Sequence, residues 1–193
     1  AKPDETLLEH TEKALKVLVS LKETYPEVPK IVDVPHCWDN LFYSVFLHDF
    51  GKGAVGFQEE INGGKKWNYR HEILSAGFVA TFDLPEKDKE AIALAIITHH
   101  KDLRTLREKY ATTISTGKKR FEERRKELQE NLDELNSYLQ HIPIWSKQYL
   151  GKELDQFAPL DSFLNLIDAY KTYVAPYYYR VEDGDLSPQE ALY

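Results

Sequence analysis

The chain has 193 residues, of which 42% are hydrophobic and 30% are charged, and its formal net charge is −7. These values are typical of one globular domain, and a chain of this size buries about 70% of its unfolded surface. A bound metal ion would therefore serve chemistry rather than hold the fold together. One cysteine excludes an intrachain disulfide and a cysteine-rich zinc cluster, so a metal ion must bind histidine and carboxylate side chains.

The apolar segments of the chain are short. The longest uncharged one, residues 91–97, falls far below the roughly 20 residues that span a bilayer. Residues 1–10 place acidic side chains before the first apolar pair, unlike a secretory leader. We therefore expect no contact with a membrane and a cytoplasmic location.

Positive charge is concentrated in one segment of this acidic chain. Residues 101–130 contain ten Lys or Arg and six Asp or Glu, whereas the whole chain is negative. Such a segment can form a local basic surface for nucleic acid, although a solvated charged helix face is the more common explanation.

The first half of the chain has helical periodicity. Thr6 and Glu9 have the spacing of a capping box, and apolar residues at helical intervals then predict a helix from residue 7 to about 24. Prolines interrupt the next stretch, in which residues 31–34 give the only hint of a strand. A second apolar stripe, residues 38–46, predicts a helix that ends at His48 and Asp49.

Helical periodicity resumes after a segment that is predicted to be a loop. Residues 51–69 are rich in glycine and have no apolar period. Helical spacing begins again at His71, a further helix begins near Pro85 and ends at His99 and His100, and residues 103–110 are helical by composition.

The last third is predicted to be helical and highly charged. We expect Gly117 to interrupt a helix, and an apolar edge on residues 121–139 to form a protruding charged helical hairpin. A last helix covers residues 157–171. The fold class predicted is therefore all-α, a single-domain helical bundle at residues 1–176 followed by a tail or linker at residues 177–193.

Five of the seven histidines lie on or beside the predicted apolar stripes. They come from separate helices or helix ends and are His10, His48, His71, His99 and His100. A single histidine on an apolar face is usually a hydrogen-bonded core residue. Burying five imidazoles and the carboxylate of Asp49 would cost about 1–3 kcal/mol for each polar atom left unsatisfied, and metal ions would satisfy them together.

The number and type of these side chains predict the metal. Five imidazoles with two carboxylates exceed one coordination sphere, so we expect two divalent ions. Nitrogen ligands favour transition metals such as Mn, Fe, Co or Ni, and make Mg less favourable.

The order of these residues resembles a known family. The His48-Asp49 pair, taken with His10, His71, His99-His100 and a late Asp, resembles the HD superfamily of metal-dependent phosphohydrolases. The segments LLEH, LHDFGK, RHEILSA and IITHH resemble more narrowly the HD nuclease domain of the CRISPR-associated type I nuclease/helicase. The resemblance covers residues 7 to about 170 and implies an HD-domain helical bundle.

The resemblance implies two sets of metal ligands that share Asp49 as a bridge. One ion would be held by His10, His48, Asp49 and a C-terminal Asp, and the other by His71, His99 and His100 with Asp49. Asp168 fits the late position because it follows an apolar run. Asp161 is the competitor, and a helix surface or cap role is the alternative for either residue.

The expected chemistry is phosphodiester hydrolysis. Two ions that share a water lower its pKa and neutralise the charge that develops on the phosphate oxygens. Asp49 and Lys52 are therefore the candidate catalytic residues, with the Lys52 ammonium directed toward a phosphate oxygen or the leaving group. A solvated lysine at a helix C-terminus is the alternative for Lys52.

The loop before His71 is a candidate nucleic-acid interface. Lys65, Lys66 and Arg70 alternate with the aromatic residues Trp67 and Tyr69. Cations that hold a backbone beside rings that stack on bases suit single-strand binding. The alternative is a flexible loop whose Trp67 packs on the body of the protein.

These interpretations together predict a nuclease that hydrolyses single-stranded DNA, by endonucleolytic cleavage, 3′–5′ exonucleolytic cleavage or both. The family resemblance implies a role in type I CRISPR interference, with a helicase in cis or in trans and a surveillance complex as partners. Two alternatives remain: a phosphohydrolase of deoxynucleotides or cyclic dinucleotides, and a docking module that has lost catalysis. The complete set of histidines argues against the latter.

Overall fold

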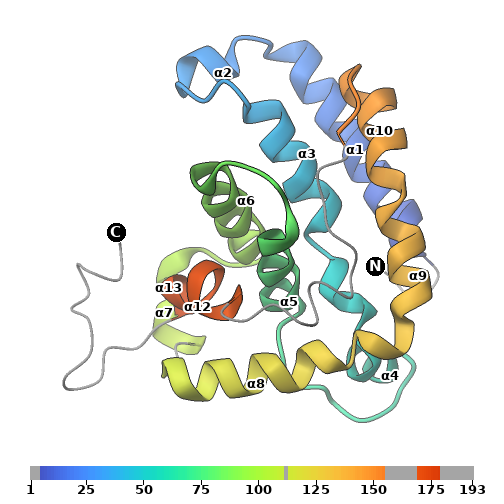
Figure 1. Ribbon diagram of the computed structural model, residues 1–193, viewed down its shortest axis with the longest axis vertical. Helices are drawn as coiled ribbons and strands as arrows, with labels where there is room; N and C mark the ends of the chain where they lie inside the picture. The colour runs from blue at the N-terminus through green and yellow to red at the C-terminus, as the bar shows by residue number, and fades with distance from the viewer. Residues whose placement is uncertain (1–4, 111–112, 155–168, 179–193) are drawn as a thin grey trace.

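The computed structural model describes residues 5–110, 113–154 and 169–178, and these residues form helices and contain no β-strand (Figure 1). The all-α fold class is therefore confirmed. The α-helices are α1 (Leu7–Thr24), α2 (Val28–Ile31), α3 (Cys37–Leu47), α4 (Val55–Ile61), α5 (His71–Phe78), α6 (Glu86–Thr98), α7 (Leu103–Tyr110), α8 (Ile114–Lys126), α9 (Leu132–Leu139), α10 (His141–Leu150), α12 (Ala169–Tyr173) and α13 (Ala175–Tyr178). Short 3₁₀ helices are η1 (Phe50–Gly53), η2 (Val79–Thr81) and η3 (Gln129–Asn131). No helix in the described ranges is long and apolar enough to cross a lipid bilayer.

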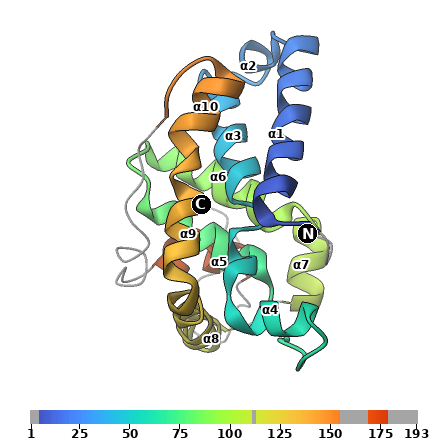
Figure 2. The ribbon, with the colours of Figure 1, turned by 90° about the vertical axis from the view of Figure 1, so that its right-hand side faces the viewer.

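Helices α3, α5 and α6 form the centre of the molecule, and the other helices surround them (Figures 1 and 2). Helices α1 and α10 pack on α3 along one side, while α8 crosses the base of the molecule and packs on α5 and α12. This arrangement brings one end of each of α1, α3, α5 and α6 toward the middle of the molecule.

The predicted capping box fixes the start of α1. The Thr6 hydroxyl accepts a hydrogen bond from the backbone N–H of Glu9, and the Glu9 carboxylate accepts one from the backbone N–H of Thr6. Leu15 and Leu18 then bury the apolar face of α1. The cap and the apolar period together explain why the predicted and observed bounds of this helix agree.

A buried tyrosine connects three helices around the end of α3. The Tyr138 hydroxyl of α9 donates a hydrogen bond of 2.5 Å to the carbonyl of Phe46 and lies 2.9 Å from Thr11 Oγ1 of α1. Just beyond α3, Phe50 stacks on Phe78 of α5, with ring centroids 4.4 Å apart. These contacts hold the chain on both sides of His48 and Asp49.

One prediction about the first 70 residues is wrong, and the hint of a strand is not realised. Of residues 31–34, which carry that hint, Ile31 ends the helical turn α2 and the others form no strand. Part of the predicted loop at residues 51–69 forms η1 and α4. Helix α4 has no side-chain cap, and its Phe57 packs on Trp67 at a centroid distance of 5.7 Å. Tertiary packing therefore stabilises α4, and the periodicity of the local sequence does not reveal such packing.

The charged segment after α7 also differs from the prediction. Helix α8 runs through Gly117 without interruption. The apolar edge does not belong to a protruding hairpin, because Phe121, Leu128, Leu135 and Leu139 are all buried. Helix α8 packs under the body, and α9 leads into α10 (Figure 2).

The first residues of the predicted tail belong to a helix. Tyr177, which the prediction places in the tail, belongs to α13 and packs against the core. Most of the predicted helix at residues 157–171, and residues 179–193 of the predicted tail, lie outside the described residues.

Candidate metal centre

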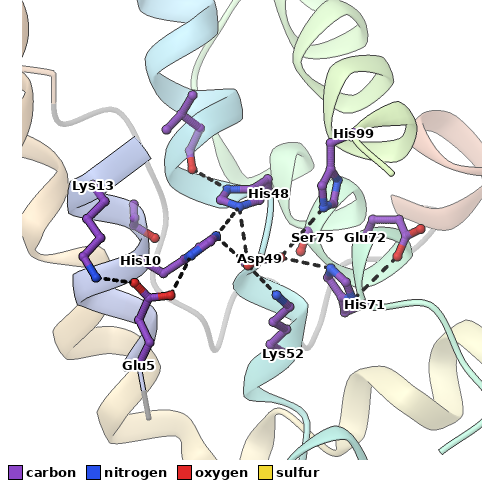
Figure 3. Close-up of polar contacts among 12 residues, drawn as sticks. Glu5, His10, Lys13, His48, Asp49, Lys52, His71, Glu72, Ser75 and His99 are labelled. Atoms are coloured by element: carbon purple, nitrogen blue, oxygen red, sulfur yellow. Dashed lines mark hydrogen bonds and ion pairs between the residues drawn. The ribbon is translucent and has the colours of Figure 1, made fainter. Parts of the chain in front are cut away.

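Asp49 lies at the centre of a cluster of imidazoles. It follows α3 immediately, its side chain is 1% exposed, and both carboxylate oxygens face histidine rings (Figure 3). His48 and Asp49 come from the end of α3. The other rings come from α1, from the first residue of α5 and from the two residues that follow α6.

The first donor group surrounds the Oδ2 atom of Asp49. His10 Nε2 lies 3.3 Å from this oxygen, and His48 Nε2 lies 3.4 Å from it. The two Nε2 atoms are 3.3 Å apart. His10, His48 and Asp49 can thus offer one ligand atom each to a common ion.

The second donor group faces the Oδ1 atom of Asp49. His71 Nε2 lies 3.0 Å from Oδ1, and His99 Nε2 lies 3.8 Å from it. His100 packs edge-to-face on His71 at a centroid distance of 5.2 Å, and one ligand atom from each of these four residues lies within 4.8 Å of the others. One carboxylate therefore belongs to both groups.

Backbone hydrogen bonds fix which ring nitrogens face Asp49. His48 Nδ1 donates to the carbonyl of Val45 at 2.7 Å, and His99 Nδ1 donates to the carbonyl of Ile96 at 2.5 Å. A neutral imidazole that donates through Nδ1 keeps a lone pair on Nε2. These Nε2 lone pairs face the Asp49 carboxylate, which also carries lone pairs. A cation between them would accept electron density from both groups.

The donor set fits a divalent transition metal on two counts. Within the described part of the chain, the buried Nε2 atoms of His71 and His99 have no well-formed hydrogen bond, although the ion pair with Asp49 brings His71 Nε2 to 3.0 Å from Oδ1. Ligands about 2.1 Å from a common ion, in tetrahedral or octahedral geometry, lie about 3.0–3.4 Å apart, and the separations around Oδ2 fall in this range. Nitrogen donors with one carboxylate suit Mn, Fe, Co or Ni better than Mg.

Burial and neighbouring charges set the protonation of the cluster. Burial raises the pKa of Asp49, but His48, His71 and Lys52 outweigh it and hold that pKa far below its ordinary value. Burial lowers the pKa of His99 to about 3, and burial followed by the proximity of His71 lowers the pKa of His100. At neutral pH Asp49 is ionised and His99 is neutral, which are the forms that bind a metal ion.

Lys52 lies at the edge of the first donor group. It follows Asp49 on η1, and its Nζ lies 2.5 Å from Asp49 Oδ2. Its side chain is 12% exposed, so it is not the solvated lysine of the alternative interpretation. Contact between Lys52 and a phosphate remains a prediction.

Sequence reasoning missed Glu5, which contacts the cluster from outside. Glu5 Oε2 lies 3.1 Å from His10 Nδ1, and Glu5 Oε1 forms an ion pair with Lys13 Nζ at 2.6 Å. A carboxylate on the remote nitrogen of a metal-binding histidine fixes the tautomer and the ring orientation. Glu5 precedes α1 and has no periodic relation to the histidines, so the sequence contains no signal for it.

The predicted late ligand cannot be placed. Asp168 and its competitor Asp161 both lie outside the described residues. Whether one of them completes the first donor group stays a prediction.

The loop before α5 differs from the expected base-stacking platform. Lys65 and Lys66 are exposed, whereas Trp67 is 4% exposed and donates through Nε1 to Glu127 Oε2 at 2.7 Å. Trp67 is therefore a core residue, as in the alternative interpretation, and is not available to a base. Arg70 forms an ion pair with Glu72 and stacks on the Tyr110 ring, 4.5 Å from its centroid.

The comparisons with known proteins agree with this geometry. No curated protein sequence and no solved structure matches the chain. The sequence model of the HD domain matches residues 7–170, a range that contains His10, the His48-Asp49 pair and the three later histidines of the cluster. The chain therefore belongs to the HD domain family, whose members are metal-dependent phosphohydrolases.

Proposed function

We propose that this protein is a metal-dependent nuclease that hydrolyses the phosphodiester bonds of single-stranded DNA. The observation that carries the proposal is the position of Asp49, whose two oxygens face two separate groups of imidazole nitrogens. This is the arrangement that a two-metal hydrolase needs, because one carboxylate can hold both ions close together.

The proposed roles follow from the two donor groups. One ion would be held by His10, His48, Asp49 and, as the resemblance implies, Asp168, and the other by Asp49, His71, His99 and His100. When bound, two divalent ions supply a nucleophilic water at neutral pH and neutralise charge on the phosphate. The backbone contacts of His48 and His99 keep their Nε2 lone pairs directed inward during this reaction.

Lys52 has a proposed role as an electrostatic partner of the substrate. Its ammonium already lies beside Asp49, and an ammonium has three protons to donate. One of them binds the carboxylate, so the others can bind a phosphate oxygen or the leaving group.

A strand as substrate is favoured by exposed positive charge in the segment that precedes His71. Lys65 and Lys66 are exposed in the loop that leads to His71. The narrower sequence resemblance supports a place in type I CRISPR interference, with a helicase in cis or in trans that supplies the strand and a surveillance complex that recruits the protein.

Hydrolysis of a small nucleotide is the second candidate, and one observation favours it. Burial of Trp67 removes the exposed aromatic ring that pointed to a polymer. The two candidates are separated by assaying one preparation against single-stranded DNA, duplex DNA, RNA, deoxynucleotides and cyclic dinucleotides. Mn, Co, Ni and Mg are each supplied in turn. Preferential hydrolysis of deoxynucleotides or cyclic dinucleotides would replace the nuclease proposal.

Asp49→Asn tests the shared carboxylate. The substitution keeps the size of the side chain and removes its charge, so hydrolysis should fall at least 100-fold and metal binding should weaken at both donor groups. The measurements are the rate of hydrolysis and metal titration by calorimetry. Asp133→Asn, an exposed carboxylate on α9, is the matched control and should retain both properties. Full activity of Asp49→Asn would refute the site.

A further inference from the structure

A hollow lies against the first turn of α5. It is a cavity of about 350 Å³, and Arg70 and Ile73 line it on either side of His71. Its other walls come from α4, the segment before α5, the end of α7, α8 and α12. Because His71 belongs to the metal cluster, the cavity and the donor groups share the same helical turn.

Three cations line this cavity. Arg120 of α8 donates through Nη2 to the carbonyl of Asn68 at 3.0 Å, and its side chain is exposed. Lys66 is exposed beside it, and Arg70 forms the ion pair with Glu72. The carboxylate in the lining, Glu60, already accepts a hydrogen bond of 2.8 Å from the backbone N–H of Trp67. The lining therefore carries an excess of positive charge.

Aromatic rings line the same cavity. Tyr110 is 42% exposed, and the Arg70 guanidinium holds its ring by the cation–π contact described above. Arg120 lies 5.7 Å from the centroid of the Tyr69 ring. Guanidinium groups that stack on tyrosines hold the rings in place, and the exposed Arg120 guanidinium can also contact an anion.

We propose that this cavity binds one nucleotide of the substrate strand. The base stacks on Tyr110 and the phosphate pairs with Arg120 and Lys66. Cations that follow a backbone beside rings that stack on bases are the elements of single-strand recognition, and the volume lies within the range of small-ligand sites. The proposal rests on the proposed nuclease function, because a strand that crosses the metal centre must continue along the surface beside it.

A free nucleotide has the same chemistry as a nucleotide of a strand. The position of the cavity favours the strand, because Arg70 in its lining precedes His71 of the second donor group, so a strand bound at the metal centre could extend to the cavity. A small substrate hydrolysed at the metal centre has no need of this second cavity.

The experiment measures binding without catalysis. Fluorescence anisotropy of labelled oligothymidylate is measured in EDTA with the wild-type chain, Arg120→Gln and Tyr110→Leu, and thymidine monophosphate is used as a competitor. Tyr110→Leu should bind the oligonucleotide about tenfold more weakly because a base loses its stacking partner. Arg120→Gln should also bind it about tenfold more weakly, because a phosphate loses its charged partner, and this loss should shrink as salt is added. Arg104→Gln and Tyr25→Leu, exposed residues outside the cavity, are matched controls and should bind like the wild type.

The outcomes separate the cavity from the nuclease function. Unchanged affinity of both variants, with folding verified by circular dichroism, would overturn the cavity proposal even if hydrolysis were observed. Tight binding of thymidine monophosphate that the oligonucleotide does not displace would overturn the assignment to a strand. Binding that depends on Arg120 and Tyr110 supports the cavity even when no metal ion yields strand hydrolysis, and in that case the nuclease proposal alone fails.

Discussion

Glu5 illustrates how a residue outside a metal cluster can govern it. The Lys13 ammonium, which is its main partner, lowers the pKa of Glu5, so the carboxylate is ionised at neutral pH. An ionised carboxylate holds the proton of His10 on Nδ1 and leaves the Nε2 lone pair directed at Asp49. Glu5 is thus a positioning residue that acts through His10.

Glu5→Ala should weaken metal binding about 10–100-fold, because His10 loses the partner that fixes its tautomer and ring. Glu5→Gln should retain most of the affinity, since its amide oxygen can still accept the Nδ1 proton. Calorimetric titration with Co²⁺ measures this directly. Glu9→Gln preserves the capping box and is the control. An Ala variant that binds Co²⁺ like the wild type would show that His10 needs no such support.

Trp67 shows what a loop sequence cannot reveal. Lys-Lys-Trp-Asn-Tyr looks exposed because it contains charges and lies between helices. Its indole nevertheless finds an acceptor in Glu127, which is 60 residues away in sequence. A buried tryptophan needs such a partner for its N–H, and a partner so remote leaves no local pattern.

At the scale of elements, the junction of η1 and α5 determines the distance between Asp49 and His71. Gly51 packs so closely on α5 that a Cβ atom there would overlap the carbonyl oxygen of His71. Its N–H donates to the Ser75 hydroxyl at 2.8 Å. Only a glycine permits this approach, which carries the second donor group to the carboxylate.

Gly51→Ala should therefore reduce the free energy of unfolding by about 1–3 kcal/mol and also weaken metal binding, because α5 must move away from Asp49. Gly63→Ala is a control for stability alone. An alanine at the positive φ of 84° should cost a similar energy, about 1–2 kcal/mol, and its Cβ would meet no other atom within 4 Å. Urea unfolding and metal titration on both variants separate the two effects. Equal metal affinities of Gly51→Ala and Gly63→Ala would contradict this role of Gly51.

The helices that the sequence predicted well are those with their own local signals. Helix α1 has a cap and a long apolar period, and α3 and α6 end at their histidines as expected. Helix α4 lacks both signals and depends on contacts such as that of Gly56 N with Glu127 Oε2 at 3.1 Å. Histidines at helix ends are predictable for the same reason, whereas the contact of Glu5 with His10 and the place of Tyr110 in the cavity are not.

At the scale of the whole molecule, the donor groups connect four helices that are far apart in sequence. His10 belongs to α1 and His99 follows α6, yet both face one carboxylate. An ion that binds the folded chain and not the unfolded chain stabilises it by mass action.

Mn²⁺ or Co²⁺ at 100 times its dissociation constant should therefore raise the free energy of unfolding by about 2.7 kcal/mol, and EDTA should reverse the gain. Thermal unfolding with and without metal measures the effect. His48→Ala should lose most of the gain, while His36→Asn, a substitution of an exposed histidine, should keep it. A melting temperature that does not respond to any of these ions would argue against a preformed site.

The sharing of Asp49 has a consequence for how the centre loads. Charge withdrawn from the carboxylate by one cation alters its attraction for the next, and ordering of His10 and His48 also orders Asp49 for the opposite group. In the proposed two-ion centre the two occupancies would therefore be thermodynamically linked, with the same coupling factor in both directions. Binding of two ions there would be a cooperative equilibrium, in which no single intrinsic affinity describes both positions.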